Sequence, residues 1–294
     1  MIPINNRIKL FFNRIFESLF LENFFIACCA AALVLATFII NDLPVKLTTY
    51  SVFLFSSTFL VYNFHYLSFK IVFSTPKALI NSALKIQMKT SLKIFLPISI
   101  GVSVILFFYL NFISCLLIFL LGAFAVAYSI PIIKWQNTRL KLREISIVKT
   151  PLIALVWGIT TGLIPILEQN IRIDFSFGLM QVLCRSLFIF ALCIPFEMRD
   201  LEKDKKSGIG TIAVIYGIKN SKIAGLFIGI CAIIIHHLMP LSFLTMLSLD
   251  LAATTAMIWI VMQNVFDGKY FYKIFVDGTM LLLFILLLTA KAIS

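Results

Sequence analysis

The chain has 294 residues, of which 61% are hydrophobic and 13% charged, and its formal net charge is +12. A soluble domain is about 45–50% apolar and roughly 25% charged, so this composition excludes an ordinary soluble protein and favours a polytopic membrane protein. Long apolar runs recur along the whole length and leave no room for a separate soluble domain. We therefore expect one membrane domain over residues 1–294.

The predicted elements begin with residues 1–19, which are basic and amphipathic and lack an apolar core followed by a small-residue cleavage site. This pattern predicts a helix on the membrane surface rather than a signal peptide. Nine apolar runs follow. Each has about twenty residues, which is enough to cross roughly 30 Å of hydrocarbon as a helix. We expect transmembrane helices near residues 20–41, 47–69, 93–112, 113–131, 145–167, 174–196, 219–239, 241–263 and 273–292.

The basic residues are distributed unevenly over the connections between these predicted spans. Most of the 25 Lys and Arg residues lie on the side of the N-terminus, whereas the opposite side holds only Lys46, Arg172 and Lys291. This positive-inside bias predicts a cytoplasmic N-terminus and a multi-pass protein of the cell inner membrane. It also explains the basic charge without a nucleic-acid partner. The cytoplasmic connections are the longer ones, so we expect the functional site on that side.

Three charged residues interrupt the apolar runs, and such residues face the interior of a bundle by default. Arg185 and Asp250 are expected to form an ion pair in the middle of the membrane, and Asp277 lies near the cytoplasmic end of the last span. His236 and His237 lie at the opposite end of their span, where we expect a structural role.

The stretch "EMRDLEKDKKSG", residues 197–208, concentrates charge between two apolar runs. If the preceding helix continues past Pro195, the four-residue spacing places Asp200 and Asp204 on one face. Glu197 adds a third carboxylate close by. Hard oxygen ligands at this spacing suit Mg²⁺, which proteins usually hold through one or two carboxylates together with substrate phosphates. Nearby basic residues can meet the remaining phosphate charge.

The longer stretch "EMRDLEKDKKSGIGTIAVIYG" resembles the second aspartate-rich motif of the UbiA superfamily of intramembrane prenyltransferases. The segment "AYSIPIIKWQ", with Tyr128 and Lys134, is similar to the end of that family's fourth span. The resemblance implies an all-α bundle of nine transmembrane helices around a central cavity. It also implies that Mg²⁺ binds an isoprenyl diphosphate at the cytoplasmic mouth, with the prenyl chain in an apolar tunnel among the membrane lipids. The residues that match the motif are Arg199, Asp200, Asp204, Gly208, Thr211 and Gly217.

The resemblance assigns roles to individual side chains. Asp200 and Asp204 would be the catalytic, metal-binding pair, with Glu197 as a third metal ligand. Diphosphate loss would leave an allylic cation, which an aromatic or other lipid acceptor captures. The residues expected to bind the substrate are Asn63, Lys70, Tyr128, Lys134, Lys149, Arg199 and Lys203.

The first aspartate-rich motif of the family is degenerate in this chain. The corresponding stretch, "VYNFHYLSFKI", keeps Asn63 but has Phe64, Leu67 and Ile71 where the family has aspartates. Neutral partners such as Asn63 and His65, or the distant Asp277, are candidates to replace these carboxylates. Three hypotheses follow: a prenyltransferase that works with one Mg²⁺, a terpene synthase or cyclase that acts on a prenyl diphosphate without an acceptor, and a non-catalytic protein that binds prenyl lipids.

Overall fold

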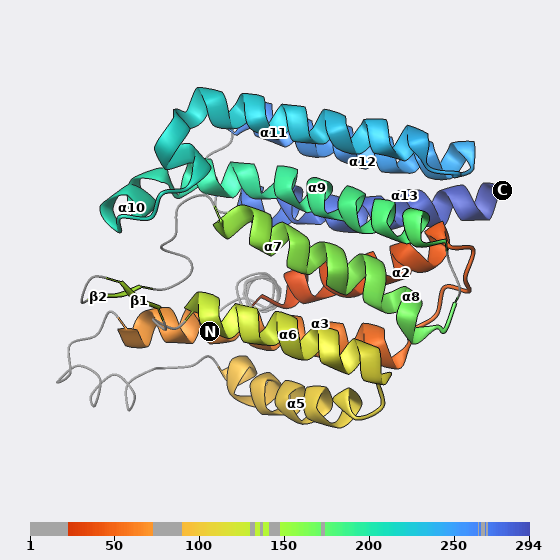
Figure 1. Cartoon of the computed structure of the whole chain (residues 1–294), viewed down its shortest axis with the longest axis horizontal. Coiled ribbons are helices and arrows are strands. Elements are labelled where there is room, and N and C mark those ends of the chain that lie inside the picture. Colours follow the sequence, from red (N-terminus) through yellow and green to blue (C-terminus); the bar gives the residue numbers. More distant parts are fainter. Residues whose placement is uncertain are drawn as a thin grey trace, which may run out of the picture. The chain divides into compact units, whose positions relative to one another are not determined.

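The computed structural model of the chain consists of helices and one short hairpin (Figure 1). It describes residues 23–72, 90–129, 133–135, 138–140, 148–171, 174–263, 265, 268 and 270–294, without the side chains of 64–72, 90–93 and 124–147. The predicted surface helix at 1–19 lies outside the described residues. The chain divides into two compact units, residues 1–31 with 48–109, and residues 32–47 with 110–294.

The first unit is built around two antiparallel helices, α3 (Thr49–Val72) and α5 (Thr90–Phe107), together with the start of α2 (Phe24–Ile40). The hydroxyl of Ser103 donates a hydrogen bond to that of Ser56 at 2.8 Å and joins α3 to α5. Ala27 and Phe59 are buried, and Phe24, Phe55 and Leu96 pack against them. Apolar packing with one buried polar contact therefore holds this unit together.

In the second unit, the long helix α9 (Phe175–Arg199) lies between its neighbours and contacts α7, α11 and α12. Twelve of its residues are buried, and they include polar side chains near both ends of the helix. The other elements are α6 (Phe112–Ser129), β1 (Ile133–Trp135), β2 (Thr138–Leu140), α7 (Lys149–Gly158), η2 (Ile159–Leu163), α8 (Ile164–Glu168), α10 (Leu201–Lys206), α11 (Ile212–Leu238), α12 (Phe243–Met262), η3 (Phe271–Val276) and α13 (Gly278–Ile293).

Small residues let these helices approach closely. A Cβ atom added to Gly225 of α11 would come within 2.8 Å of Ile260 Cδ1 of α12, so a larger residue at this crossing would force the Ile260 side chain to shift. Large apolar side chains such as Phe175, Phe227 and Phe243 are exposed on the outer surface instead. Apolar residues that cover the outside as well as the core are typical of a protein whose solvent is lipid.

The described part of the chain contains five helical segments that are long and apolar enough to cross a membrane, at 149–168, 175–199, 212–238, 243–262 and 271–293. Each of the other predicted spans also coincides with a described helix, α2, α3, α5 or α6. The chain is thus an integral multi-pass membrane protein, while the count of nine crossings and their orientation stay predictions.

Two details differ from the sequence-based expectations. The bundle is all-α as predicted, but β1 and β2 add a short antiparallel hairpin in the connection after α6, with Lys134 opposite Arg139. The predicted span at 145–167 is one continuous path through α7, η2 and α8, with a π-helical stretch in its middle. Neither feature has a hydrophobic pattern of its own, so periodicity could not reveal it.

Candidate functional site

The charged stretch lies where α9 ends and α10 begins. Helix α9 accommodates Pro195 and runs on to Arg199, as predicted, and Asp200 occupies the junction between the two helices. The backbone N–H of Asp204 donates to the carbonyl of Asp200 at 2.8 Å, so the two aspartates are one helical turn apart. Gly208 then reverses the chain with a φ of 69°, a left-handed conformation that glycine adopts at little cost.

Asp204 is buried in this junction, and a lysine from another helix reaches it. Lys149 is the first residue of α7, and its Nζ lies 3.4 Å from Asp204 Oδ2. Asp204 is 5% exposed. A carboxylate this deeply buried requires a positive partner, because an isolated charge in an apolar interior is strongly unfavourable. Lys149 therefore neutralises Asp204 in the absence of any other cation.

Asp200 is paired with its neighbour Arg199. The Nε and Nη2 atoms of Arg199 each donate to one carboxylate oxygen of Asp200 at 2.9 Å, the two-pronged geometry that arginine prefers. The guanidinium also lies over the rings of Tyr272 and Phe196, 4.7 and 5.0 Å from their centroids. Both rings favour a cation above their faces and fix its position.

These contacts determine the charge of Asp200. Burial alone would raise the pKa of its carboxyl. The hydrogen bonds and positive charge of Arg199, aided by the charges of Lys203 and Lys149, outweigh burial and hold the pKa below its usual range. Asp200 is therefore ionised at neutral pH and available to a cation.

Glu197 lies one turn before Asp200 and is 3% exposed. The hydroxyl of Thr150, from α7, donates to its Oε1, and the N–H groups of Ile212 and Ala213 at the start of α11 face the carboxylate. Its Oε2 has no hydrogen-bond partner among the described residues. A buried carboxylate oxygen without a donor is a place where a further positive or donating group is favourable.

Asp277 was expected at the cytoplasmic mouth as a partial replacement for the lost motif. It follows η3, and its carboxylate is close enough to Arg199 for their charges to attract. The structure therefore places it on the same end of the second unit as the motif.

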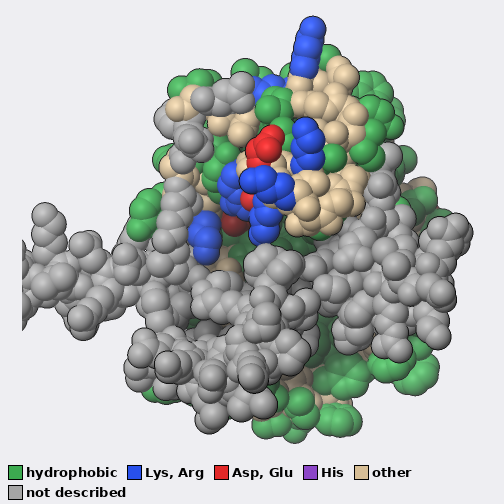
Figure 2. All heavy atoms as spheres, turned by 90° about the vertical axis from the view of Figure 1, so that its left-hand side faces the viewer, with side chains coloured by type: hydrophobic (Ala, Val, Ile, Leu, Met, Phe, Trp, Pro, Cys, Tyr) green, Lys and Arg blue, Asp and Glu red, His purple; other side chains and the backbone are tan. Residues whose placement is uncertain are grey.

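Figure 2 shows basic and acidic side chains gathered on this end of the molecule, beside apolar surface. The described residues contain no group of three His, Cys, Asp or Glu side chains that could hold a metal by themselves. Mg²⁺, however, is commonly bound by one or two carboxylates and completed by substrate phosphates. Asp200 and Asp204 supply hard oxygen donors one helical turn apart, so the donor chemistry fits such an ion.

The remaining predicted site residues lie on α10, in the first unit or outside the described residues. Asn63 belongs to the first unit, where its Nδ2 donates to the carbonyl of Phe59 at 2.8 Å and its Oδ1 accepts from Asn23. Lys203 lies on α10 and is exposed. The side chains of His65, Lys70, Tyr128 and Lys134 lie outside the described residues.

Sequence reasoning missed two residues of this site. Thr150 and Tyr272 are both buried, the first beside Glu197 and the second beneath Arg199. Lys149 was predicted to bind substrate, and Thr150 is the next residue in the sequence, so its position beside Lys149 could have indicated it. Tyr272 offered only an aromatic residue near a span end, a position that is ordinarily explained by the membrane interface.

The expected ion pair between Arg185 and Asp250 is wrong. Both oxygens of Asp250 are occupied instead by histidines, with His236 Nδ1 at 2.9 Å and His237 Nε2 at 3.0 Å. The reason is the short turn between α11 and α12, which sets the last turn of α11 against the second turn of α12. The two histidines therefore connect α11 to α12 through Asp250, the residue that had been expected to pair with Arg185.

Comparison with known proteins bears on the same junction. The sequence model of the UbiA prenyltransferase family matches residues 85–273, which include Lys149, the whole charged stretch and Tyr272. The chain belongs to the UbiA prenyltransferase family. No curated protein sequence matches this UbiA chain.

Two solved structures share the UbiA fold with this chain. The apo structure of a UbiA homolog from Aeropyrum pernix K1 aligns with a TM-score of 0.60 at 13% identity, covering 93% of this chain and 98% of that one. A structure of digeranylgeranylglyceryl phosphate synthase aligns with a TM-score of 0.53 at 16% identity, covering 94% of this chain and 98% of that one. At such identities the likeness bears on the fold alone.

Proposed function

We propose that this protein is a Mg²⁺-dependent prenyltransferase that moves an isoprenyl group from a prenyl diphosphate to an aromatic or other lipid acceptor. The observation that carries the proposal is the junction of α9 and α10, where Asp200 and Asp204 lie one turn apart beside fixed cations. Membership of the UbiA prenyltransferase family supports it. So does digeranylgeranylglyceryl phosphate synthase, a structural relative that by its name makes a prenylated glyceryl phosphate.

The proposal assigns a role to each charged side chain. Asp200 and Asp204 hold Mg²⁺, with Glu197 as an additional oxygen donor. Lys149 and Arg199, which neutralise the two aspartates in the structure, turn toward the phosphates when substrate is present. Lys203 adds charge from α10. The ring of Tyr272 limits how far the Arg199 guanidinium can move.

In the proposed reaction, the bond between the allylic carbon and the diphosphate oxygen breaks, and the oxygen keeps the electron pair. Bound Mg²⁺ would stabilise the negative charge of the leaving diphosphate. Lys149 and Arg199 turn toward the phosphates when substrate binds, so they are in place to stabilise this charge as it develops. The acceptor then supplies the electron pair for the new carbon bond and releases a proton.

We further propose that the chain forms a single UbiA-like domain with nine spans in the cell inner membrane and with the N-terminus in the cytoplasm. The charged junction would then open to the cytoplasm, where soluble diphosphates are available. In this arrangement Asn63, Lys70, Tyr128 and Lys134 complete the substrate site, and His65 and Asp277 are additional candidates.

A non-catalytic prenyl-lipid-binding protein is the second candidate function. The observation that favours it is that both aspartates are already neutralised by a lysine and an arginine, in a chain whose first motif has lost its carboxylates. A terpene synthase would use the same junction and would differ from a transferase only in the fate of the allylic cation. Product analysis without an acceptor therefore separates it from a transferase.

The experiment that tests the proposal is diphosphate release by the full-length protein in detergent, with geranyl, farnesyl or geranylgeranyl diphosphate and Mg²⁺. We expect release with at least one donor, its loss in EDTA, and its recovery when Mg²⁺ is restored. The variant Asp200→Asn with Asp204→Asn should release diphosphate at least about 100-fold more slowly, because it removes the charges that bind the metal.

Glu202→Gln is the matched control, because Glu202 is an exposed carboxylate on the same short helix and has no role in the proposal. This variant should keep the wild-type rate. Activity that survives the double aspartate change would contradict the enzyme mechanism. Prenyl diphosphate binding without release for every donor would support the binding protein instead.

A further inference from the structure

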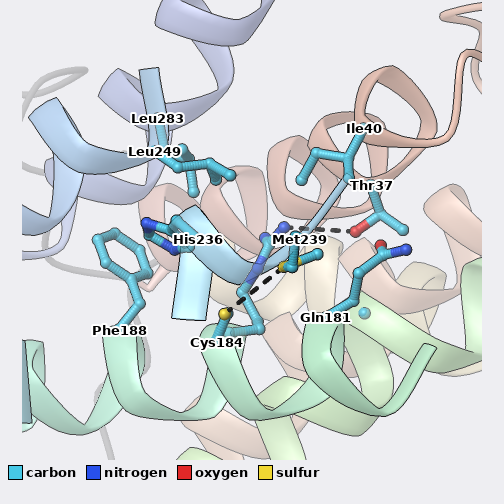
Figure 3. Close-up of a pocket in the computed structure, with 11 residues that line it drawn as sticks. Thr37, Ile40, Gln181, Cys184, Phe188, His236, Met239, Leu249 and Leu283 are labelled. Carbon is cyan, nitrogen blue, oxygen red and sulfur yellow. Dashed lines mark hydrogen bonds between the residues drawn. The ribbon is translucent and has the colours of Figure 1, made fainter. Parts of the chain in front are cut away.

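A second polar cluster lies inside the second unit, away from the aspartate motif. It surrounds a cavity of about 20 Å³ between α2, α9, α11, α12 and α13, where Thr37, Gln181, His236 and Met239 converge (Figure 3). Arg185 of α9 also lines this cavity. Arg185 precedes Asp200 by fifteen residues, about 22 Å along a helix, so the cavity is separate from the proposed diphosphate site.

The guanidinium of Arg185 is buried here with neutral partners. The side chain is 5% exposed, and its two hydrogen bonds go to the carbonyl of Leu33 at 3.3 Å and the hydroxyl of Thr37 at 3.4 Å. It forms no ion pair with any described residue. A guanidinium carries five N–H donors, so most of its donor capacity and all of its charge are unmatched by these two oxygens.

No carboxylate among the described residues pairs directly with this guanidinium. Asp250 has both carboxylate oxygens engaged by His236 and His237. Gln181 exchanges two hydrogen bonds of 3.0 Å with Asn41, and the Thr37 hydroxyl donates to the carbonyl of Thr161 at 2.6 Å. The cavity therefore presents a buried guanidinium that has N–H donors to spare and no direct ion-pair partner among the described residues.

We propose that this cavity is a binding site for a small monovalent anion, a halide or a single carboxylate group, with Arg185 as its counter-ion. The volume admits a group of that size and excludes a diphosphate. The remaining walls include Phe188, Leu249 and Leu283, and such apolar surroundings strengthen the attraction between opposite charges. A buried arginine is favourable only with such compensation.

A free ion and the carboxylate of a membrane fatty acid share this chemistry. The test is the thermal unfolding of the full-length protein in detergent at constant ionic strength, with gluconate replaced stepwise by bromide or formate, and separately with added fatty acid. An anion at roughly ten times its Kd should raise the Tm by about 3 °C. A rise with bromide or formate identifies a free ion, and a rise with fatty acid alone identifies a lipid carboxylate.

The decisive comparison is between two variants that lose one positive charge. Arg185→Gln should abolish the anion-dependent rise, whereas Lys219→Gln, at an exposed position of α11, should keep it. If Arg185→Gln does not fold, Ile40→Phe provides the same test, because it fills the cavity and leaves the arginine in place. Anion dependence that persists in the cavity-filled variant overturns the proposal.

Crystals of the wild-type protein grown in bromide give a direct measurement. We expect an anomalous peak beside the Arg185 guanidinium. Water alone at this position, together with a Tm that responds equally to gluconate, bromide, formate and fatty acid, contradicts the proposal. These readouts do not involve prenyl transfer, so they stand or fall independently of the proposed activity.

Discussion

Glu197 is the most enclosed carboxylate of the charged stretch, and the Thr150 hydroxyl is its side-chain hydrogen-bond donor among the described residues. Thr150 donates to one oxygen, and the other has no partner among the described residues. A buried group that loses its donor bears the full desolvation penalty, about 1–3 kcal/mol and more for a charged group. Thr150 thus connects the start of α7 to the last turn of α9.

At this scale we predict that Thr150→Val lowers the free energy of unfolding by about 1–3 kcal/mol, because Glu197 then lacks its donor. Thermal unfolding in detergent measures the change. The matched control is Thr254→Val on α12, where the hydroxyl is exposed and bonds only within its own helix. Equal Tm values for the two variants would show that Thr150 does not stabilise Glu197.

The kink of helix α11 depends on the backbone conformation of one glycine rather than on a side-chain contact. Gly217 has φ 76° and ψ 168° inside the run from Ile212 to Leu238, and the helix is kinked there. This region of conformational space is essentially restricted to glycine and costs other residues about 1–3 kcal/mol. The kink lets the chain turn from the Thr211 cap into the long membrane segment.

The corresponding prediction is that Gly217→Ala destabilises the protein by about 1–3 kcal/mol. Gly101→Ala in α5 is the control, because a Cβ atom meets nothing within 4 Å at either position and only the backbone conformation differs. In an ordinary helix this change is stabilising by about 0.5–1 kcal/mol. Tm shifts of opposite sign are expected, and a Tm loss of the same size at both positions would contradict the role of the kink.

At the scale of the whole molecule, the charged junction expected inside and the residues expected outside lie at opposite ends of the second unit. Lys291 Nζ donates to the carbonyl of Leu43 at 2.7 Å, and Asn41 pairs with Gln181 near the start of α9. Lys291 and the connection after α2, both expected on the outside, therefore lie at the end of α9 opposite Asp200. The charged junction and the lysine-poor connections lie at opposite ends of the same helix.

This arrangement predicts the labelling pattern of single cysteines in intact cells. On a background without the six native cysteines, Lys46→Cys should react with a membrane-impermeant maleimide added outside, and Lys203→Cys should react only after permeabilisation. Both positions are exposed in the structure. The reverse pattern would show that the charged junction faces the exterior, and the proposed cytoplasmic site would then be wrong.

Much of this architecture is predictable from sequence because membrane helices must satisfy their backbone hydrogen bonds internally. Long apolar runs therefore become helices wherever they occur, and the positions of α9, α12 and α13 follow from composition. The spacing of Asp200 and Asp204 indicated that they lie one turn apart if α9 continues past Pro195, and the helix does continue to Arg199. The hairpin β1–β2 and the π-helical stretch η2 were not, because they arise from local backbone geometry without a repeating pattern.

The sequence by itself determined the membrane class, the position of the helices and the carboxylates that lie at the junction of α9 and α10. Only the tertiary structure decided which charges meet. Lys149 and Asp204 are 55 residues apart in sequence, Arg199 lies over Tyr272, and Asp250 binds two histidines instead of Arg185. The physical reason is that charge pairing depends on which helix faces cross and at what depth, and this follows from close packing of many side chains rather than from spacing along one chain.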